Sequence, residues 1–184
     1  FGTAFNLLGG EVRETVGMSN SALAKGESLY DTARVLSGYS DIITMRHPQA
    51  DSVAEFAAGS RVPVINGGDG ANEHPTQALL DLYTIKKECQ SHGRKIDGLH
   101  IAMIGDLKYG RTVHSLCKLL SLYNNIHFTL ISPTELAMPE SILTAITNGG
   151  HELTITDQLS GSVDAARSRS KWGFRGSVSA RRSV

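Results

Sequence analysis

The sequence predicts an α/β fold in which two parallel-sheet α/β domains are joined by one long helix, both domains being incomplete within the 184 residues. Short apolar runs typical of strands alternate with helical patterns along residues 1–160, as in parallel sheets with helices packed on them. A long helical pattern beginning at Pro75 divides this alternation, and proline suits the first turn of a helix, where its missing N–H costs nothing. Only three strand patterns follow that helix, which is few for a whole α/β domain.

The first domain is predicted to alternate helices and strands. One helix face is formed by four apolar residues at helical spacing, Leu29, Ala33, Val35 and Leu36. The glycine-rich segment 67–70 closes the last strand as a turn. In chain order we expect the end of a helix at 1–8, a strand at 11–16, a loop at 18–26, a helix at 27–37, a strand at 41–45, a helix at 51–58 and a strand at 62–66.

The long helix is expected to run from Thr76 to about Gln90, and the domain boundary is placed in it or just after it. Its apolar residues are Leu79, Leu80, Tyr83 and Ile85. A second alternation follows, with a polar connection at 91–98, a strand at 99–104, a helix at 112–122, a strand at 128–132, a helix at 139–148 and a strand at 152–156.

Residues 161–184 differ from the rest of the chain. They hold six Lys or Arg and one Asp, a net charge of +5 that balances −5 over residues 1–160. A basic end is typical of an interaction arm, but this stretch has six Ser, five Arg and no sustained apolar periodicity. We interpret it as a non-native or disordered tail, from vector-encoded or frame-shifted translation rather than a natural flexible arm.

The overall composition fits a globular protein with a core, since 40% of the residues are hydrophobic and 20% are charged. A net charge of zero argues against an obligate nucleic-acid binder. The longest apolar runs, such as 101–104, are far shorter than the roughly 20 residues of a membrane span. No signal-peptide pattern is visible, so we expect a cytoplasmic protein. Cys89 and Cys117 lack metal-ligand spacing and are expected to be reduced, partly buried thiols.

Arg46 is the first candidate for a functional role, because it directly follows a predicted buried strand. That places it at the carboxyl edge of a parallel sheet, where open α/β folds bind ligands. The planar guanidinium suits phosphate or carboxylate. The alternative is an ordinary surface arginine after a strand.

His74 and Gln77 lie at the beginning of the long helix. The backbone N–H groups and the dipole of a helix N-terminus favour negative charge there. A neutral imidazole can donate a hydrogen bond to a carbonyl oxygen, and Gln77 can pair with an amide. The alternative is simple helix capping, with His74 as an incidental loop residue.

Arg111 and Lys25 are weaker candidates. The segment 105–111 lacks the G-x-G-x-x-G spacing and the Lys-Ser/Thr ending of nucleotide-binding loops. An arginine at a helix N-terminus on the carboxyl edge of a strand nevertheless suits a carboxylate partner. Lys25 precedes a glycine in a loop and could swing onto a phosphate, or it could be a solvated loop lysine.

Four segments together resemble the aspartate carbamoyltransferases, in order and approximate spacing, over about residues 1–160. The histidine–proline–x–glutamine motif is shared with ornithine carbamoyltransferases and indicates only the superfamily. The arginine–histidine–proline–glutamine and GDLKYGRTVHS segments indicate the aspartate enzymes. The four segments are KGESL at 25–29, MRHPQ at 45–49, HPTQALLD at 74–81 and GDLKYGRTVHS at 105–115.

The resemblance implies transfer of the carbamoyl group from carbamoyl phosphate to the amino group of L-aspartate, an early step of pyrimidine biosynthesis, with no metal or organic cofactor. It implies that Arg46 holds the phosphate and that His74 polarises the carbonyl oxygen as negative charge develops there. Gln77 would bind the carbamoyl amino group, and Arg111 would bind a carboxylate of aspartate. Positioning and electrostatics would supply most of the rate.

The resemblance also implies a homotrimer of catalytic chains, with or without regulatory chains. In that trimer Ser21 and Lys25 would reach into the active site of the neighbouring subunit. The implied domains are a carbamoyl-phosphate-binding domain at 1–75 with its N-terminal part missing, a linking helix and connection at 76–98, and the first part of an aspartate-binding domain at 99–160.

Two family segments are expected outside this sequence. The serine–threonine–arginine–threonine–arginine phosphate loop would lie just upstream of Phe1, and further aspartate-binding segments would follow residue 160. Each lost charge-assisted hydrogen bond costs about 1.5–3 kcal/mol. We therefore expect the chain to be inactive on its own although its parent is an active transferase, and carbamoylaspartate formation by the purified chain would contradict this.

Three other functions compete with this interpretation. A nicotinamide-dependent oxidoreductase is disfavoured by the absent G-x-G-x-x-G motif. An ornithine carbamoyltransferase-like enzyme is disfavoured by the GDLKYGR segment. A non-catalytic family member acting as a binding or structural subunit would not need the chemically competent side chains at all six positions, Ser21, Lys25, Arg46, His74, Gln77 and Arg111.

Overall fold

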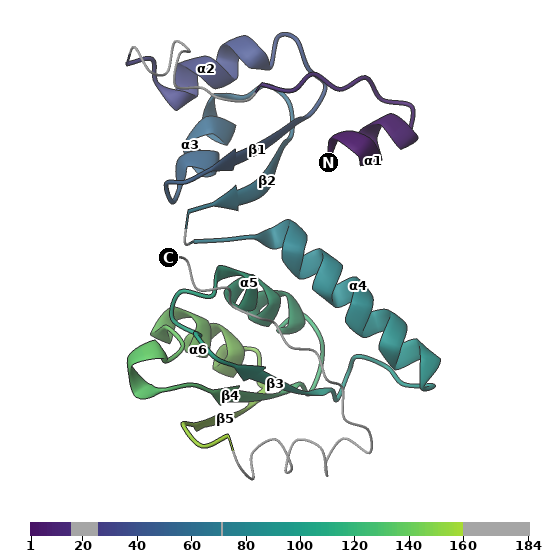
Figure 1. Ribbon diagram of the computed structural model, residues 1–184, viewed down its shortest axis with the longest axis vertical. Helices are drawn as coiled ribbons and strands as arrows, with labels where there is room; N and C mark the ends of the chain where they lie inside the picture. The colour runs from purple at the N-terminus through teal and green to yellow at the C-terminus, as the bar shows by residue number, and fades with distance from the viewer. Residues whose placement is uncertain (16–25, 71, 160–184) are drawn as a thin grey trace. The chain divides into compact units, whose positions relative to one another are not determined.

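The computed structural model describes residues 1–15, 26–70 and 72–159. The chain divides into two compact units, Phe1–Asn72 and Glu73–Val184. Each unit has its own parallel sheet with helices packed on it, which confirms the predicted fold class (Figure 1). The division falls just before the long helix rather than within or after it, so this helix belongs to the second unit.

The first unit is built around a two-stranded parallel sheet. Its strands are joined through a helix, and a second helix packs on that connection, as Figure 1 shows. The elements are α1 (Gly2–Leu7), α2 (Leu29–Leu36), β1 (Ile43–His47), α3 (Ser52–Gly59) and β2 (Val64–Asp69).

Local contacts explain where α2 begins and how closely it packs. The hydroxyl of Ser28 accepts a hydrogen bond from the backbone N–H of Asp31 at 3.0 Å, which caps the helix N-terminus. Gly59 ends α3 against α2, and a Cβ at this position would overlap the backbone of Tyr30. Only glycine therefore allows this approach of the two helices without displacing one of them.

The second unit is built around a three-stranded parallel sheet in the order β3-β4-β5. The long helix α4 packs on α5, and α5 packs on α6. The elements are α4 (Pro75–Ser91), β3 (His100–Ile104), α5 (Arg111–Leu120), β4 (His127–Ile131), the 3-10 helix η3 (Thr134–Leu136), α6 (Glu140–Asn148) and β5 (Glu152–Thr156).

The hydrophobic core of the second unit lies around the central strand β4. Its residues 128–131 are all buried, as expected for a parallel strand covered on both faces. The largest fully buried side chains come from this strand, from α5 and α6, and from two connecting segments; they are Leu107, Cys117, Leu120, Ile126, Phe128, Leu130 and Ile146.

Several predicted details differ from the structure. No strand is present in the described part of the predicted strand at 11–16, residues 11–15. Strand β2 continues through the glycines to Asp69, because it keeps pairing with β1 there. Val35 is 56% exposed and so is not on the packed face of α2. Three of the four apolar residues expected on α4 are also exposed, namely Leu79, Leu80 and Tyr83.

In residues 1–15, 26–70 and 72–159, no helix combines the length and the apolar character needed to cross a bilayer.

Candidate functional site

Arg46 lies on β1 opposite a bulge in β2. The parallel register shifts between Met45 and His47, so that Arg46 faces two residues of β2, Gly67 and Gly68. A bulge bends the strand locally and changes the direction of nearby side chains. Arg46 is the exposed residue of its strand, so the structure gives this candidate anion-binding arginine access to solvent.

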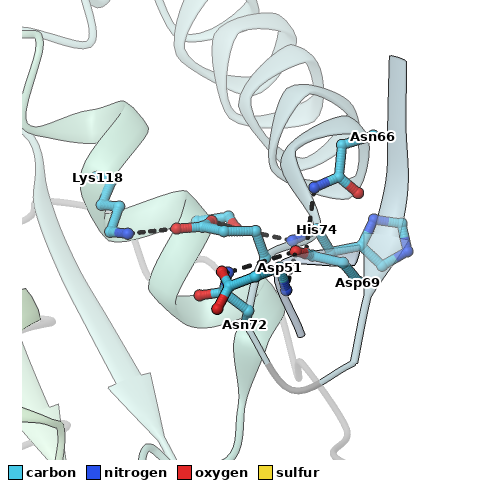
Figure 2. Close-up of polar contacts among 8 residues, drawn as sticks. Asp51, Asn66, Asp69, Asn72, His74 and Lys118 are labelled. Atoms are coloured by element: carbon cyan, nitrogen blue, oxygen red, sulfur yellow. Dashed lines mark hydrogen bonds and ion pairs between the residues drawn. The ribbon is translucent and has the colours of Figure 1, made fainter. Parts of the chain in front are cut away.

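A hydrogen-bonded group of side chains, the Asp69 cluster, lies at the same ends of β1 and β2. It consists of Asp51, Asn66, Asp69 and Asn72 (Figure 2). Asp69 is only 3% exposed. Its Oδ1 accepts from Asn66 Nδ2 at 3.1 Å, and its Oδ2 accepts from the backbone N–H of Asp51 at 3.2 Å. These donors compensate the cost of burying the carboxylate.

His74 is the residue that caps α4. Its Nδ1 accepts a hydrogen bond from the backbone N–H of Gln77 at 3.3 Å. In a neutral imidazole one nitrogen accepts and the other carries the proton, so an accepting Nδ1 places the proton on Nε2. The ring therefore caps the helix through one nitrogen only, so capping and the ligand-binding role proposed from the sequence are compatible.

The backbone of His74 is held by α5. Its N–H donates to the hydroxyl of Ser115 at 3.0 Å. The hydroxyl of Ser115 in turn donates to Oε2 of Glu73, and Nζ of Lys118 donates to Oε1 of the same carboxylate. Lys118 is labelled in Figure 2. This anchor, defined as Glu73, Ser115 and Lys118, fixes the position at which the chain enters α4.

Gln77 points its amide nitrogen at Asp81, donating to Oδ1 at 3.0 Å. The two residues are four positions apart and share one face of α4. Because the nitrogen is used in this bond, the orientation of the amide is set, and its oxygen is the end that can accept from a ligand NH₂ group.

Arg111 is the first residue of α5, after a loop that is tightly held. Oδ1 of Asp106 accepts from the backbone N–H groups of Lys108 and Tyr109 at 3.1 and 3.0 Å. His114 Nε2 also contacts the carbonyl oxygen of Leu107 at 2.7 Å. Arg111 is therefore placed at the carboxyl end of β3 and at a helix N-terminus, as predicted.

The structure brings part of the predicted site together. Arg111 and Ser115 are four residues apart and lie on one face of α5. Since Ser115 binds the backbone of His74, His74 and Arg111 lie within about one helical turn of the same anchor. Arg46 belongs to the first unit and is described only within it. Ser21 and Lys25 lie outside the described residues.

A groove of about 320 Å³ runs between α4 and α5. The anchor residues border it, and the rest of its lining is largely apolar. The lining residues are Glu73, Pro75, Ala78, Leu79, Ser115, Lys118, Leu119 and Leu122. None of the predicted ligand-binding side chains belongs to this lining.

The two cysteines are free and buried, as predicted. Burial raises the pKa of the Cys117 thiol to about 12. Burial also raises the pKa of Cys89, with Arg94 opposing and Glu88 adding to the shift. Raised pKa values keep both thiols protonated and unreactive near neutral pH. Within the described part of the chain, no group of three or more His, Cys, Asp or Glu side chains is arranged to hold a metal ion.

Asp69 and Ser115 were not among the site residues predicted from the sequence. Asp69 directly follows the paired glycines of β2, and a polar residue beside a glycine pair in a strand is a signal for a held bulge. Ser115 stands one helical turn after Arg111, which marked it as a neighbour of a candidate residue. Neither signal identifies the partner, because Glu73 is 42 positions away from Ser115.

Comparisons with known proteins agree on one family. The sequence model described as the aspartate/ornithine carbamoyltransferase carbamoyl-P binding domain matches residues 1–87. The aspartate carbamoyltransferase catalytic subunit of Cellvibrio japonicus is 72% identical over 163 residues, which are 89% of this chain and 48% of that relative. The corresponding subunit of Methanococcus vannielii is 57% identical over 143 residues, 78% of this chain and 46% of that relative.

Solved structures give the same result. The catalytic subunit of M. jannaschii aspartate transcarbamoylase has a TM-score of 0.74 at 49% identity, over 86% of this chain and 50% of that one. Aspartate transcarbamoylase of Trypanosoma cruzi, in complex with N-(phosphonacetyl)-L-aspartic acid, has a TM-score of 0.74 at 43% identity, over 85% of this chain and 51% of that one. The chain spans about half the length of the curated relatives it matches. The chain belongs to the aspartate/ornithine carbamoyltransferase family, and its similarity is to the catalytic subunits of aspartate carbamoyltransferases.

Proposed function

We propose that this chain carries substrate-binding parts of an aspartate carbamoyltransferase. The reaction is transfer of the carbamoyl group from carbamoyl phosphate to the amino group of L-aspartate, giving N-carbamoyl-L-aspartate and phosphate. The observation that carries the proposal is the position of His74, which caps the N-terminus of α4 and is bound through its backbone N–H to Ser115 of α5, the helix that begins at Arg111. The names of the relatives support the choice of reaction.

Arg46 is proposed to bind the phosphate of carbamoyl phosphate. It is exposed at the carboxyl end of β1, where its guanidinium can form paired hydrogen bonds with phosphate oxygens. Binding the phosphate holds the carbamoyl carbon for attack and stabilises the charge that grows on the leaving group.

His74 and Gln77 are proposed to hold the carbamoyl group. The Nε2 proton of His74 would be donated to the carbonyl oxygen, which gains negative charge as the carbonyl carbon is attacked. The amide oxygen of Gln77 would accept from the carbamoyl NH₂ group, since its nitrogen already donates to Asp81. Both groups belong to the beginning of one helix, so their separation is fixed by the helix itself.

Arg111 is proposed to bind a carboxylate of aspartate and so to direct its amino group towards the carbamoyl carbon. A C–N bond forms, the C–O bond to phosphate breaks, and the departing phosphate can take up a proton released by the amine. Every step is a matter of orientation and charge stabilisation by side chains.

The assembly and location are part of the same proposal. We place the chain in a homotrimer in the cytoplasm, where Ser21 and Lys25 serve the active site of a neighbouring subunit. The supporting observation is the similarity to catalytic subunits. The step would then belong to pyrimidine biosynthesis.

The experiment that tests the proposal is a calorimetric titration of the full chain with N-(phosphonacetyl)-L-aspartate. This ligand carries a phosphonate group and the two carboxylates of aspartate in one molecule. We expect binding, with Arg46→Ala and Arg111→Ala each weakening it by about tenfold or more, the equivalent of a lost charge-assisted hydrogen bond. Arg61→Ala is the matched control, because this exposed arginine precedes β2 at the opposite edge of the sheet. Absent binding, or an equal loss in the control, would refute the proposal.

Turnover is measured separately, by product formation from carbamoyl phosphate with either aspartate or ornithine. We expect carbamoylaspartate formation by this chain to be near background, because it spans about half the length of its relatives. Product from ornithine and not from aspartate would favour the ornithine enzyme. Ligand binding that requires Arg46 and Arg111 would argue against a purely structural role.

A further inference from the structure

We infer that Asn66 and Asp69 are positioning residues for Arg46, because their side chains hold the bulge of β2 that faces it. The inference rests on the proposed phosphate-binding role of Arg46. Neither residue is required to touch the ligand. Their role is to fix the backbone from which the arginine extends.

The first support is the way in which the bulge is closed. Asn66 Oδ1 accepts from the backbone N–H of Gly68 at 2.7 Å, inside the bulge. The nitrogen of the same amide donates to Asp69 Oδ1 at 3.1 Å, on the far side of the two glycines (Figure 2). One side chain therefore spans the irregular residues and satisfies an N–H that lies outside the regular ladder.

The second support is the use of the other carboxylate oxygen. Asp69 Oδ2 accepts from the backbone N–H of Asp51 at 3.2 Å, at the end of the loop that follows β1. The backbone N–H of Gly70 donates to the carbonyl oxygen of His47 at 2.9 Å. A Cβ on Gly70 would lie 2.7 Å from the carbonyl oxygen of Pro48. The segment after Arg46 is thus held against the end of β2 by side chain, backbone and close packing.

The third support is the absence of any side chain at the bulge itself. A Cβ on Gly67 would lie 3.6 Å from the Cβ of Arg46 and 3.2 Å from the carbonyl oxygen of Met45. Glycines make this close approach possible but provide no side chain to stabilise it. The neighbouring Asn66 and Asp69 supply those contacts. An arginine that forms paired hydrogen bonds with phosphate needs its direction fixed, because such bonds depend strongly on angle.

The test uses the full chain, inorganic phosphate as the probe, and five variants. Arg46→Ala removes the proposed phosphate-binding side chain. Asn66→Ala removes the contact with Gly68 and the donor to Asp69. Asp69→Asn keeps the shape and removes the carboxylate. The double variant Asn66→Asp with Asp69→Asn reverses donor and acceptor. Ser60→Ala is the matched control, because the Ser60 hydroxyl makes two hydrogen bonds with the backbone of Val62 in the same unit and none with the Asp69 cluster.

Three quantities are measured for each variant: the phosphate dissociation constant, the NMR signal of the Arg46 Nε–H group, and the exchange rate of the Gly68 amide. We expect Asn66→Ala and Asp69→Asn to weaken phosphate binding by about five- to tenfold, to shift the Arg46 signal and to accelerate Gly68 exchange. The double variant should recover part of all three. The control should lower the melting temperature but keep the affinity within about twofold.

The possible results separate the inference from the proposed function. If the Arg46→Ala variant binds phosphate as tightly as the parent chain does, the proposed function is wrong and the inference is wrong with it. If Arg46→Ala abolishes binding while Asn66→Ala and Asp69→Asn do not weaken it, only the inference is wrong. An equal loss of phosphate affinity in Ser60→Ala would also overturn the inference, because the effect would then follow stability alone.

Discussion

At the scale of single residues, His74 shows how one side chain can serve structure and chemistry together. Its ring caps α4 through Gln77, and its backbone N–H bonds to Ser115. The capping bond assigns the proton to the opposite ring nitrogen, which is the donor that the proposed reaction requires.

The first residue-scale prediction concerns Cys117. Burial raises the pKa of its thiol from 9.0 to about 12. Between about pH 9 and pH 12 the thiol is ionised in the unfolded chain but still protonated in the folded chain. The contribution of this thiol to the free energy of unfolding is therefore fully present below about pH 9 and is lost as the pH rises towards 12. We expect this thiol to lower the free energy of unfolding by up to about 1.4 kcal/mol per pH unit in that range.

Urea unfolding at a series of alkaline pH values checks this prediction. Cys117→Ala is the comparison, because it removes the titrating group and leaves the tyrosines and lysines in place. The pH slope should be smaller in the variant than in the parent. Identical slopes would mean that the folded thiol ionises as readily as the unfolded one.

At the scale of elements, the close approach of α2 and α3 depends on Gly59. A methyl group there would overlap the backbone of Tyr30, and a helix backbone cannot yield as a flexible side chain can. We expect Gly59→Ala to lower the free energy of unfolding by about 1–3 kcal/mol, as overpacking does elsewhere. Denaturant unfolding followed by circular dichroism measures the change.

Ala57→Gly is the control for that experiment, since Ala57 is an exposed residue of the same helix. It should cost about 0.5–1 kcal/mol through backbone entropy alone. If Gly59→Ala lowers the free energy of unfolding by no more than Ala57→Gly does, or raises it, then α2 and α3 can move apart without cost. The close approach of the two helices would then not contribute to stability.

Helix α4 illustrates the same scale in the second unit. It packs through Ala78, Leu82, Ile85 and Cys89, whereas Leu79 and Leu80 are 56% and 61% exposed. Its apolar residues therefore lie on two sides, and only one side is covered within the unit. An apolar residue predicts burial only when the neighbouring element is known.

At the scale of the whole molecule, the buried apolar residues are unevenly divided. Among the described residues, the first unit contributes only Ala33, Val53 and Phe56 to the core, while the second unit holds the main hydrophobic cluster. Local stability follows the amount of apolar surface that each region buries. We therefore expect the second unit to be the more stable of the two.

Hydrogen exchange followed by mass spectrometry tests this expectation. In the parent chain, peptides from β4 should be better protected than peptides from β1 and β2. Phe128→Ala should cost about 3–5 kcal/mol in the second unit and accelerate exchange in β3, β4 and β5. Exchange in β1 and β2 should change little. Uniform acceleration in both units would show that the chain unfolds as one cooperative body.

Much of this architecture follows from the sequence alone. The alternation of strand and helix patterns predicted two parallel-sheet units, and β5 was predicted to the residue. Pro75 marked the beginning of the long helix. The motifs around Arg46, His74 and Arg111 identified the family that the comparisons confirm. These features are local, because periodicity, proline geometry and short motifs are all encoded within a few neighbouring residues.

The tertiary structure decided what depends on distant partners. The glycines after Asn66 were predicted as a turn, but pairing with β1 makes them a bulge within β2. Ser115 holds His74 from 41 positions away. Leu79 and Leu80 fit a helix face, but the position of α5 leaves them exposed. Strand register, anchoring contacts and the covered face of a helix arise from packing between elements, and local periodicity carries no information about which elements will meet.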